Sequence, residues 1–195
     1  MNLNKLFRMN YVQDVNGNYS LLWPHVRKKK LRTIIDIGAW WGPWTLWWRK
    51  RAEKIIAFEP NPDVFLDLKQ NTSHLKQVTI HNTALGDTTG NVSMQHETHS
   101  GTFHVKDYNG SINLRTLDSY NFQNIDIIKI DVEGFEIPVL NGAKQTILSH
   151  RPWIQIEGNK SGERYGRSKI EIPHLLVSWG MKRVMKKWPD QIWTF

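Results

Sequence analysis

Cysteine is absent from this chain of 195 residues. Without thiols there is no disulfide framework, no zinc–thiolate centre and no cysteine nucleophile, so histidines and carboxylates must carry any acid–base chemistry. The chain also lacks a run of the ~18 apolar residues that a membrane span requires, and its first residues lack the apolar segment of a secretory signal. We therefore expect a cytoplasmic protein without a membrane partner.

Acidic residues are few relative to basic ones, since 18 Asp and Glu stand against 26 Lys and Arg, for a net charge of +8. The basic residues cluster in 27–32 and 181–187. Such charge attracts anions, nucleic acid among them, but it also keeps a tryptophan-rich surface in solution. A solvated basic face is the favoured interpretation and a nucleic-acid partner the less favoured one. Nothing in the sequence indicates the oligomeric state.

The remaining composition, 39% hydrophobic and 23% charged, is ordinary for a globular protein, and we expect one domain over residues 1–195. Short apolar runs alternate with helical patterns, which indicates an α/β fold with a mostly parallel sheet. A Pro-Asp turn near the end predicts an antiparallel hairpin in 182–195 that closes this sheet. The other expected strands are 32–38, 54–60, 78–85, 125–134 and 151–158, and the expected helices are 43–53, 61–71 and 136–150.

Short alternating segments punctuated by glycine fill residues 86–117 and predict a β-hairpin insertion, with pieces at 90–97, 101–105 and 111–117. This insertion carries His96, His99 and His104. Three histidines can bind zinc, although solvated side chains are the favoured interpretation. An insertion near the carboxyl edge of the sheet could instead cover a ligand pocket as a lid.

The segment "TIIDIGAWWGPWTLWW" predicts a strand, a glycine turn and a helix that Pro43 opens. Such a turn presents bare backbone N–H groups and a positive helix end to a ligand. Glu59 closes the next strand about 20 residues on, where an acidic side chain can accept hydrogen bonds from both ribose hydroxyls. Asp36 and Asp131, each at the carboxyl end of an expected strand, suit a cation better than a pyrophosphate. The pattern favours S-adenosylmethionine over a dinucleotide.

Five tryptophans crowd residues 33–51. Trp44, Trp47 and Trp48 have helical spacing and are predicted to pack against the sheet. Trp40 and Trp41 lie in the turn itself, where an indole could either wall a pocket or fill the core.

Six ordered segments, from "IIDIGAWWGPWTLWW" through "IIAFEPNPDVFLDLKQN", "NTALGDTTGNVSM", "LRTLDSY" and "IDIIKIDVEGFEIPVLNGAKQTI" to "RPWIQIE", resemble the FkbM family of S-adenosylmethionine-dependent methyltransferases. The resemblance covers about residues 33–157. It implies a Rossmann-like class I methyltransferase fold, a seven-stranded sheet with a reversed last strand, and methylation of hydroxyls, often on sugars or secondary metabolites. An N-terminal extension, 1–32, and a C-terminal helix and hairpin, 158–195, lie outside it.

The resemblance also assigns the cofactor-binding residues. Those expected around the methionine end are Asp36, Gly38, Ala39, Trp40 and Gly42, with Trp40 standing where the family usually has asparagine. Those expected around the adenosine are Glu59 and Pro60 at the ribose and Asn82 and Ala84 at the adenine, with Asp131 near the methyl group.

Methyl transfer to oxygen benefits from a base that takes the hydroxyl proton. We expect Asp131 and Glu133 to be the catalytic residues, Glu133 as base or acceptor-positioning group. Capping the following helix is the alternative for Glu133 and the favoured role for Glu136. Asp131, Glu133 and Glu157 could also hold magnesium or calcium, since these ions take oxygen ligands, but we favour a site without metal.

The sequence therefore predicts an O-methyltransferase that acts on a hydroxyl of a sugar or small metabolite, with a small-molecule or glycan acceptor. One alternative is an RNA ribose 2′-O-methyltransferase, which resembles others of its kind in a Lys-Asp-Lys-Glu set. Here Glu157 stands where the second lysine is expected, and Lys160 is a loose substitute. A cofactor-binding protein without turnover is the other alternative, whereas the missing GxGxxG disfavours an NAD-dependent enzyme.

Overall fold

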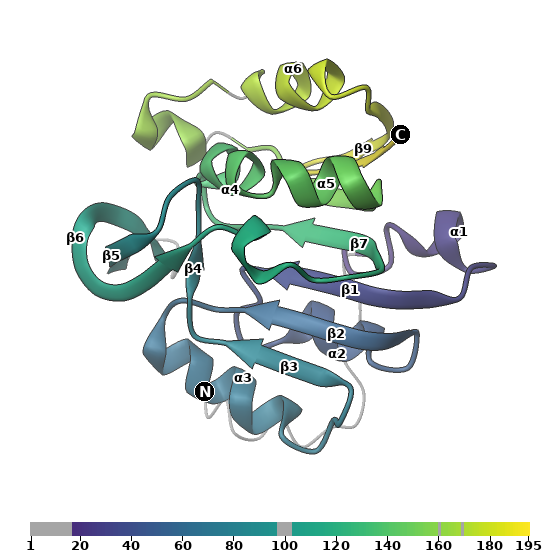
Figure 1. The fold of residues 1–195 in the computed structure, drawn as a ribbon, viewed down its shortest axis with the longest axis horizontal. Coiled ribbons are helices and arrows are strands. Elements are labelled where there is room, and N and C mark those ends of the chain that lie inside the picture. Colours follow the sequence, from purple (N-terminus) through teal and green to yellow (C-terminus); the bar gives the residue numbers. More distant parts are fainter. Residues whose placement is uncertain (1–16, 97–102, 160, 169) are drawn as a thin grey trace.

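A seven-stranded sheet forms the centre of the chain in the computed structural model, which describes residues 17–96, 103–159, 161–168 and 170–195. The strand order is β3-β2-β1-β7-β8-β10-β9 (Figure 1). All neighbours from β3 to β8 pair in parallel, while β10 runs antiparallel to both β8 and β9. The bounds are β1 Leu31–Ile37, β2 Ala52–Phe58, β3 Val78–His81, β7 Ile125–Ile130, β8 Trp153–Glu157, β9 Lys182–Lys187 and β10 Asp190–Thr194. The expected parallel sheet with a reversed last strand is confirmed.

Helices cover both faces of this sheet, because the strands are apolar on both sides. Alternation along β1 sends Ile35 and Ile37 to the face covered by α4, α5 and α6, and sends Ile34 and Asp36 to the face covered by α1, α2 and α3. The bounds are α1 Trp23–Val26, α2 Pro43–Trp48, α3 Pro62–Thr72, α4 Glu136–Gly142, α5 Lys144–His150 and α6 Glu171–Ser178, with the short 3₁₀ turns η2 Asp118–Tyr120 and η3 Ser161–Tyr165.

The starts of the helices follow their local sequence. The side chain of Asn61 accepts hydrogen bonds from the backbone N–H groups of Asp63 and Val64, so it caps α3 as expected. Trp44 and Trp48 are buried between α2 and the sheet, which confirms the helical spacing. The expected helix 43–53 is too long, however, because α2 ends at Trp48 and β2 already begins at Ala52.

A second sheet of three strands lies beyond the carboxyl ends of the central strands (Figure 1). It consists of β4 Ala84–Leu85, β5 Gly90–His96 and β6 Phe103–Arg115 in the order β4-β6-β5. The predicted hairpin insertion is confirmed, but its pieces 101–105 and 111–117 join in one long strand, β6. The expected strand 78–85, by contrast, divides into two strands, because β3 ends at His81 and β4 pairs with β6.

The expected helix 136–150 is interrupted at Ala143, which separates α4 from α5. A Cβ on Gly142 would lie 1.8 Å from the backbone oxygen of Gly86, so the end of α4 sits directly on the chain that leaves β4. In the part of the chain that the structure describes, no helix is long and apolar enough to cross a membrane.

Candidate active site

The turn between β1 and α2, residues 38–42, packs against the end of β7. Gly38 and Gly42 have φ angles of 77° and 97°, which glycine adopts without strain. A Cβ on Gly38 would lie 1.8 Å from the backbone oxygen of Asp131. Only glycine therefore allows the two strands to meet as closely as they do here.

Trp40, in the middle of this turn, has a φ of 52°. That region of conformational space is unfavourable for bulky residues and is best tolerated, after glycine, by asparagine and aspartate. The indole is 52% exposed, so burial in the core does not offset the strain. Of the two roles left open for Trp40, the structure favours the pocket wall over core packing.

Glu59 follows the last residue of β2 and holds the turn to that strand. One carboxylate oxygen accepts a hydrogen bond from the backbone N–H of Trp40 (2.8 Å), and the other accepts one from the N–H of Asn61 (2.9 Å). Burial raises the pKa of Glu59 to about 7, although both N–H groups favour the carboxylate. Its remaining lone pairs can still accept hydrogen bonds from a ligand.

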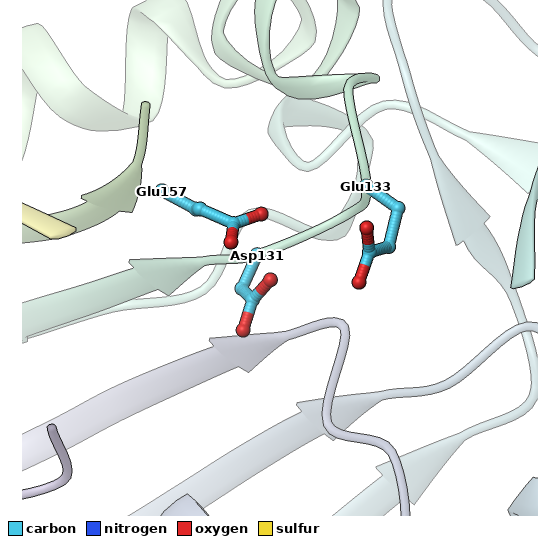
Figure 2. Close-up of side chains that lie close together, drawn as sticks. All are labelled: Asp131, Glu133 and Glu157. Carbon is cyan, nitrogen blue, oxygen red and sulfur yellow. The ribbon is translucent and has the colours of Figure 1, made fainter. Parts of the chain in front are cut away.

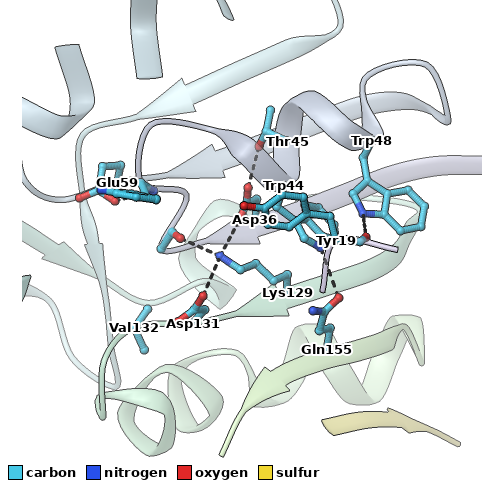
Figure 3. A network of polar contacts seen from close by, with 12 residues as sticks. Tyr19, Asp36, Trp44, Thr45, Trp48, Glu59, Lys129, Asp131, Val132 and Gln155 are labelled. Carbon is cyan, nitrogen blue, oxygen red and sulfur yellow. Dashed lines mark hydrogen bonds and ion pairs between the residues drawn. The ribbon is translucent and has the colours of Figure 1, made fainter. Parts of the chain in front are cut away.

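Lys129 is the centre of a buried polar network at the junction of β1 and β7 (Figure 3). Its Nζ lies 2.7 Å from the backbone oxygen of Gly38, 3.2 Å from Asp36 and 3.5 Å from Asp131. Asp36 also accepts a hydrogen bond from the hydroxyl of Thr45 (2.7 Å). Burial lowers the pKa of Lys129, but Asp36 and Asp131 outweigh it, and the net shift is upward. The ammonium group therefore stays charged.

Sequence reasoning missed Lys129, although a signal was present. In "IDIIKIDVEG" it is the single cation within an apolar strand, two residues before Asp131 and hence on the same face. In the sheet it pairs in register with Asp36 on β1 and with Gln155 on β8. Asp36, Lys129 and Gln155 form a row across three strands because of the strand register. The register cannot be read from the linear sequence.

Three carboxylates converge where β7 and β8 end (Figure 2). Asp131 and Glu133 follow β7, Glu157 is the last residue of β8, and one oxygen from each lies within 4.8 Å of the others. Burial raises the pKa of Glu157 to about 9, and the neighbouring carboxylates add to this shift. Its Oε2 is buried without a hydrogen-bond partner among the described residues. The oxygens of this trio could hold a hard divalent cation.

Glu136 belongs to a different environment. It is 4% exposed, and its carboxylate accepts hydrogen bonds from the backbone N–H groups of Gly134 (3.1 Å) and Val132 (3.3 Å). Burial raises its pKa to about 7. It closes the turn that leads into α4, in agreement with the structural role predicted for it.

A first cavity of about 270 Å³ lies at the carboxyl ends of β1, β2 and β7. Many of the residues that the sequence assigned to cofactor or catalysis line it: Gly38, Trp40, Glu59, Pro60, Ala84, Asp131 and Glu133. Apolar side chains, among them Phe58 and Leu85, line the rest. Glycine backbone, a buried acceptor and apolar walls in one cavity are typical of a small-ligand site.

Four residues predicted to bind the cofactor lie outside this cavity. Asp36 is buried beneath it, bound to Lys129 and Thr45, and Gly42 is the capping residue of α2. Ala39 lines a second cavity of about 220 Å³ on the other side of the turn. Asn82 donates hydrogen bonds to the backbone oxygens of Glu59 and Pro60 and braces the loop from outside.

The hairpin insertion reaches the first cavity through residues of β5 and β6, including Met94, Phe103 and His104. His96 is exposed and packs on Phe103, with ring centroids 4.7 Å apart. His99 lies outside the described residues, as does Lys160, so neither the zinc hypothesis nor the substitute lysine gains support.

The ring of His81, the last residue of β3, stacks on Phe58, with the ring centroids 4.8 Å apart and an interplanar angle of 16°. Tyr120 contacts the same ring edge-on. Burial lowers the pKa of His81, so the structure makes it part of an aromatic cluster.

The strand order and the position of the first cavity define a Rossmann-like class I methyltransferase fold, which solved structures share. A methyltransferase FkbM from Methylobacillus flagellatus KT superimposes with a TM-score of 0.59 at 18% identity, over 91% of this chain and 48% of that one. A SAM dependent methyltransferase from Aquifex aeolicus gives a TM-score of 0.53 at 12% identity, over 93% of both chains.

The chain belongs to the FkbM methyltransferase family, since the model of the methyltransferase FkbM domain matches residues 36–180. A relative, the hexuronic acid methyltransferase AglP of Haloferax volcanii, is 30% identical over 104 residues, which are 49% of this chain and 43% of the relative. The chain thus spans about half the length of the relative and of the Methylobacillus structure. The family predicted from the ordered sequence segments is confirmed.

Proposed function

We propose that this chain is an S-adenosylmethionine-dependent O-methyltransferase that acts on a hydroxyl of a sugar or small metabolite. The observation that carries the proposal is the first cavity, which brings Glu59 and Asp131 to the same edge of the sheet. Family membership supports methyl transfer, the Aquifex neighbour is called SAM dependent, and the Haloferax relative is named for a sugar acid.

The residues of the first cavity fit the parts of S-adenosylmethionine. Glu59 offers acceptor lone pairs to the ribose hydroxyls, and its position is fixed by two backbone N–H groups. Phe58, Ala84 and Leu85 offer apolar surface to the adenine. Asp131 places a carboxylate near the sulfonium, whose positive charge it favours. Cytoplasmic location, a single domain and the absence of a resident metal stay predictions.

Two carboxylates that line the cavity can divide the chemistry between them. The bound cofactor supplies an electrophilic methyl carbon. Asp131 attracts the cationic donor and, held by Lys129, keeps a fixed position at the end of β7. As the acceptor oxygen bonds to the methyl carbon, the bond from that carbon to sulfur would break and S-adenosylhomocysteine would leave, and Glu133 would accept the proton that the hydroxyl loses. Positioning the two reactants in line contributes further to the rate.

Calorimetric titration with S-adenosylhomocysteine, with NAD in parallel, tests the proposal. We expect binding of S-adenosylhomocysteine alone, and a loss of about 100-fold or more in the Glu59→Gln variant, because a buried hydrogen-bonded anchor is removed. Glu53→Gln is the matched control, since Glu53 lies on the same strand at its opposite, exposed end, paired with Lys30. Circular dichroism checks that both variants fold.

Transfer of a labelled methyl group to a panel of sugars, small hydroxylated metabolites and RNA then identifies the acceptor. Binding of S-adenosylhomocysteine without transfer to any acceptor would support the cofactor-binding protein without turnover. Transfer to RNA alone would support the ribose 2′-O-methyltransferase instead. Binding of NAD in place of S-adenosylhomocysteine would contradict the cofactor assignment itself.

A further inference from the structure

Residues 170–188, which we call the C-terminal edge, comprise α6, β9 and the turns that follow them. β9 is the last strand in the order of the central sheet, and α6 packs beside it (Figure 1). The other end of this order is β3, on the far side of the sheet. No residue of the C-terminal edge lines either cavity. The proposed reaction therefore gives this surface no role.

The C-terminal edge exposes much apolar surface. Among the described residues, eight large hydrophobic side chains are exposed, and four of the eight belong to this short segment: Ile170, Val177, Val184 and Trp188. Trp188 is the largest of the four and is 60% exposed. Single exposed apolar residues are ordinary, but such a concentration is typical of an interaction surface.

The helix α6 carries apolar residues on two opposite sides. Ile172 and Leu176 are buried in the core that covers the sheet. Ile170 and Val177, seven residues apart, lie on the outer side of the helix and are exposed. A helix that only covers a sheet has polar residues on its outer side. The outer side of α6 is therefore suited to a partner.

The same edge is strongly basic. Four of the six residues of β9 are Lys or Arg. Lys182 and Lys186 are exposed, and neither pairs with a carboxylate among the described residues. The one acidic residue in 170–188 is Glu171, which already pairs with Arg167 (3.2 Å). An anionic partner would therefore meet positive charge that the protein does not neutralise.

The strand β9 is poorly suited to pairing with a further strand. Two neighbours on β10, Ile192 and Trp193, pair with Met185 and Arg183 on β9. Val184 is therefore an extra residue, a β-bulge. Bulges and lysines keep an edge strand from adding another strand. A second copy of this chain at β9 would also bring like charges together, so the occupant is of another kind.

An anionic phospholipid bilayer matches both properties of the C-terminal edge. Its headgroups attract the cations, and its interface takes up the apolar side chains beside them. Tryptophan is favoured at this depth, because the indole combines an apolar ring with an N–H donor. A nucleic acid would attract the same cations, but its phosphate backbone offers no apolar contact to Ile170 or Val177.

We propose that the C-terminal edge docks the protein on an anionic phospholipid surface, with Trp188 and Val177 in the interface and the lysines of β9 against the headgroups. The expectation of no membrane partner concerns a spanning segment, and a protein that lies on a bilayer needs none. Trp188 directly precedes Pro189 and Asp190, which line the second cavity. Docking therefore brings the edge of the sheet that carries the cavities close to the lipid.

Sedimentation with lipid vesicles tests the docking. The full chain is mixed with vesicles of phosphatidylcholine alone or of phosphatidylcholine with phosphatidylglycerol. We expect about tenfold or more tighter binding to the anionic vesicles, and weaker binding as salt is raised, because salt screens exposed charges. Equal binding to both kinds of vesicle, or no binding to the anionic kind at low salt, would overturn the proposal.

Two variants locate the docking surface. Trp188→Ser removes the aromatic anchor, and Lys182→Gln combined with Lys186→Gln removes two cations. Each variant should weaken binding to anionic vesicles by about tenfold or more, while the affinity for S-adenosylhomocysteine stays the same. Circular dichroism checks that both fold. Unchanged vesicle binding in both variants would contradict the assignment of this surface.

Matched controls lie at the opposite edge of the sheet, on and just after α3. Leu66→Ser is the control for the apolar change, since Leu66 is 62% exposed. Lys69→Gln combined with Lys76→Gln is the control for the charge change, since both lysines are exposed. Neither control should change vesicle binding. A loss in the charge control equal to that in the β9 variant would mean that total charge, and not this surface, attracts the lipid.

The lack of native cysteine permits a direct readout of the contact. An environment-sensitive dye is attached to Val177→Cys or, as control, to Leu66→Cys. Anionic vesicles should shift the emission to the blue at position 177 and not at position 66, because only the former enters the interface. Vesicle binding without a shift at position 177 would place the contact elsewhere and overturn the proposal.

Two further outcomes would assign the C-terminal edge to another occupant. Single-stranded RNA that binds the chain, with a loss in the lysine variant but none in Trp188→Ser, would indicate a nucleic acid if anionic vesicles do not bind. A dimer in analytical ultracentrifugation that Trp188→Ser dissociates would indicate a second copy. Binding of S-adenosylhomocysteine is independent of all these results, so the docking and the proposed function can fail separately.

Discussion

The two sides of the glycine turn treat their carboxylates in opposite ways. On the β2 side, Glu59 receives two backbone hydrogen bonds and holds the turn in place. On the β8 side, Glu157 keeps a buried oxygen without a partner among the described residues, and it faces Asp190 across the strand pair. The carboxylate on the first side finds most of its hydrogen bonds within the protein. The second side keeps a buried oxygen without such a bond and two carboxyl groups that face each other, and both features lower stability. A buried oxygen that the protein leaves without a hydrogen bond is typical of a site in which a bound ligand supplies that bond.

The largest effect on stability is expected at Lys129, which lies between the two sides. Lys129→Met leaves the buried Asp36 without its cation, and breaking a buried ion pair in this way costs about 3–5 kcal/mol. Urea unfolding should show this loss in the free energy of unfolding, while Lys76→Met, at an exposed position, should show almost none. A loss below about 1 kcal/mol would mean that the network does not hold β1 to β7.

Glu133→Gln should separate catalysis from cofactor binding. Loss of a general base lowers kcat by about 100-fold or more, whereas the affinity for S-adenosylhomocysteine should stay the same. Rates on the best acceptor and calorimetry measure the two quantities, with Glu163→Gln, at an exposed position in η3, as control. If kcat stays unchanged, Glu133 is not the base. If both quantities fall together, the residue supports the cofactor cavity instead.

Glu157→Gln should change how stability depends on pH. With a pKa of about 9 in the folded chain, well above the usual value of a glutamate, Glu157 retains a proton that the unfolded chain releases. Wild-type stability therefore falls as pH rises through this interval. The variant lacks this contribution and should be about 2 kcal/mol more stable at pH 8, allowing for relaxation around the charge.

Thermal or urea unfolding at pH 5 and pH 8 measures this difference. Glu59 and Glu136, whose pKa values are raised to about 7, contribute a decrease of the same sign in both proteins. The comparison of the two slopes therefore isolates Glu157. Parallel pH profiles would show that its carboxyl group is not protonated in the folded chain.

The smallest effect concerns Trp40. Trp40→Asn should stabilise the chain by about 1 kcal/mol, because asparagine tolerates a φ of 52° better than tryptophan does. The same change should weaken the binding of S-adenosylhomocysteine, because it removes an aromatic wall of the first cavity. Trp40→Leu keeps the unfavourable backbone and removes only the ring, so unfolding and titrations with S-adenosylhomocysteine of the two variants separate strain from contact. Equal stability of both variants would contradict the strain.

The β2 side of the site could be predicted because its signals are local. A glycine turn, a proline at the first position of a helix and an acidic residue at the end of the next strand all act within a few residues. Asn61 and Pro62 likewise fixed the start of α3 in advance. The sheet and its reversed last strand followed from the alternation of segments and from the family resemblance.

The β8 side could not be predicted to the same extent, because its contacts join distant parts of the chain. Gln155 reaches the backbone of Asn18, 137 residues away, and Lys129 meets Asp36 only through strand register. The close approach of Gly142, at the end of α4, to Gly86 likewise joins parts of the chain that are far apart in the sequence. The break between α4 and α5 has a local signal, by contrast, because Asn141 and Gly142 are both weak helix formers.

Gly38, Trp40 and Asp131 line both cavities, and this shared wall has a thermodynamic consequence. A molecule in either cavity contacts Trp40 and Asp131 and so forms part of the environment of the other. When the cofactor and the acceptor both bind, their binding free energies are linked, and each changes the affinity of the other by the same factor. Titration of one in the presence and absence of the other measures that factor. Whether this factor strengthens or weakens binding decides whether the demethylated cofactor, once formed, holds the product in place or helps to release it.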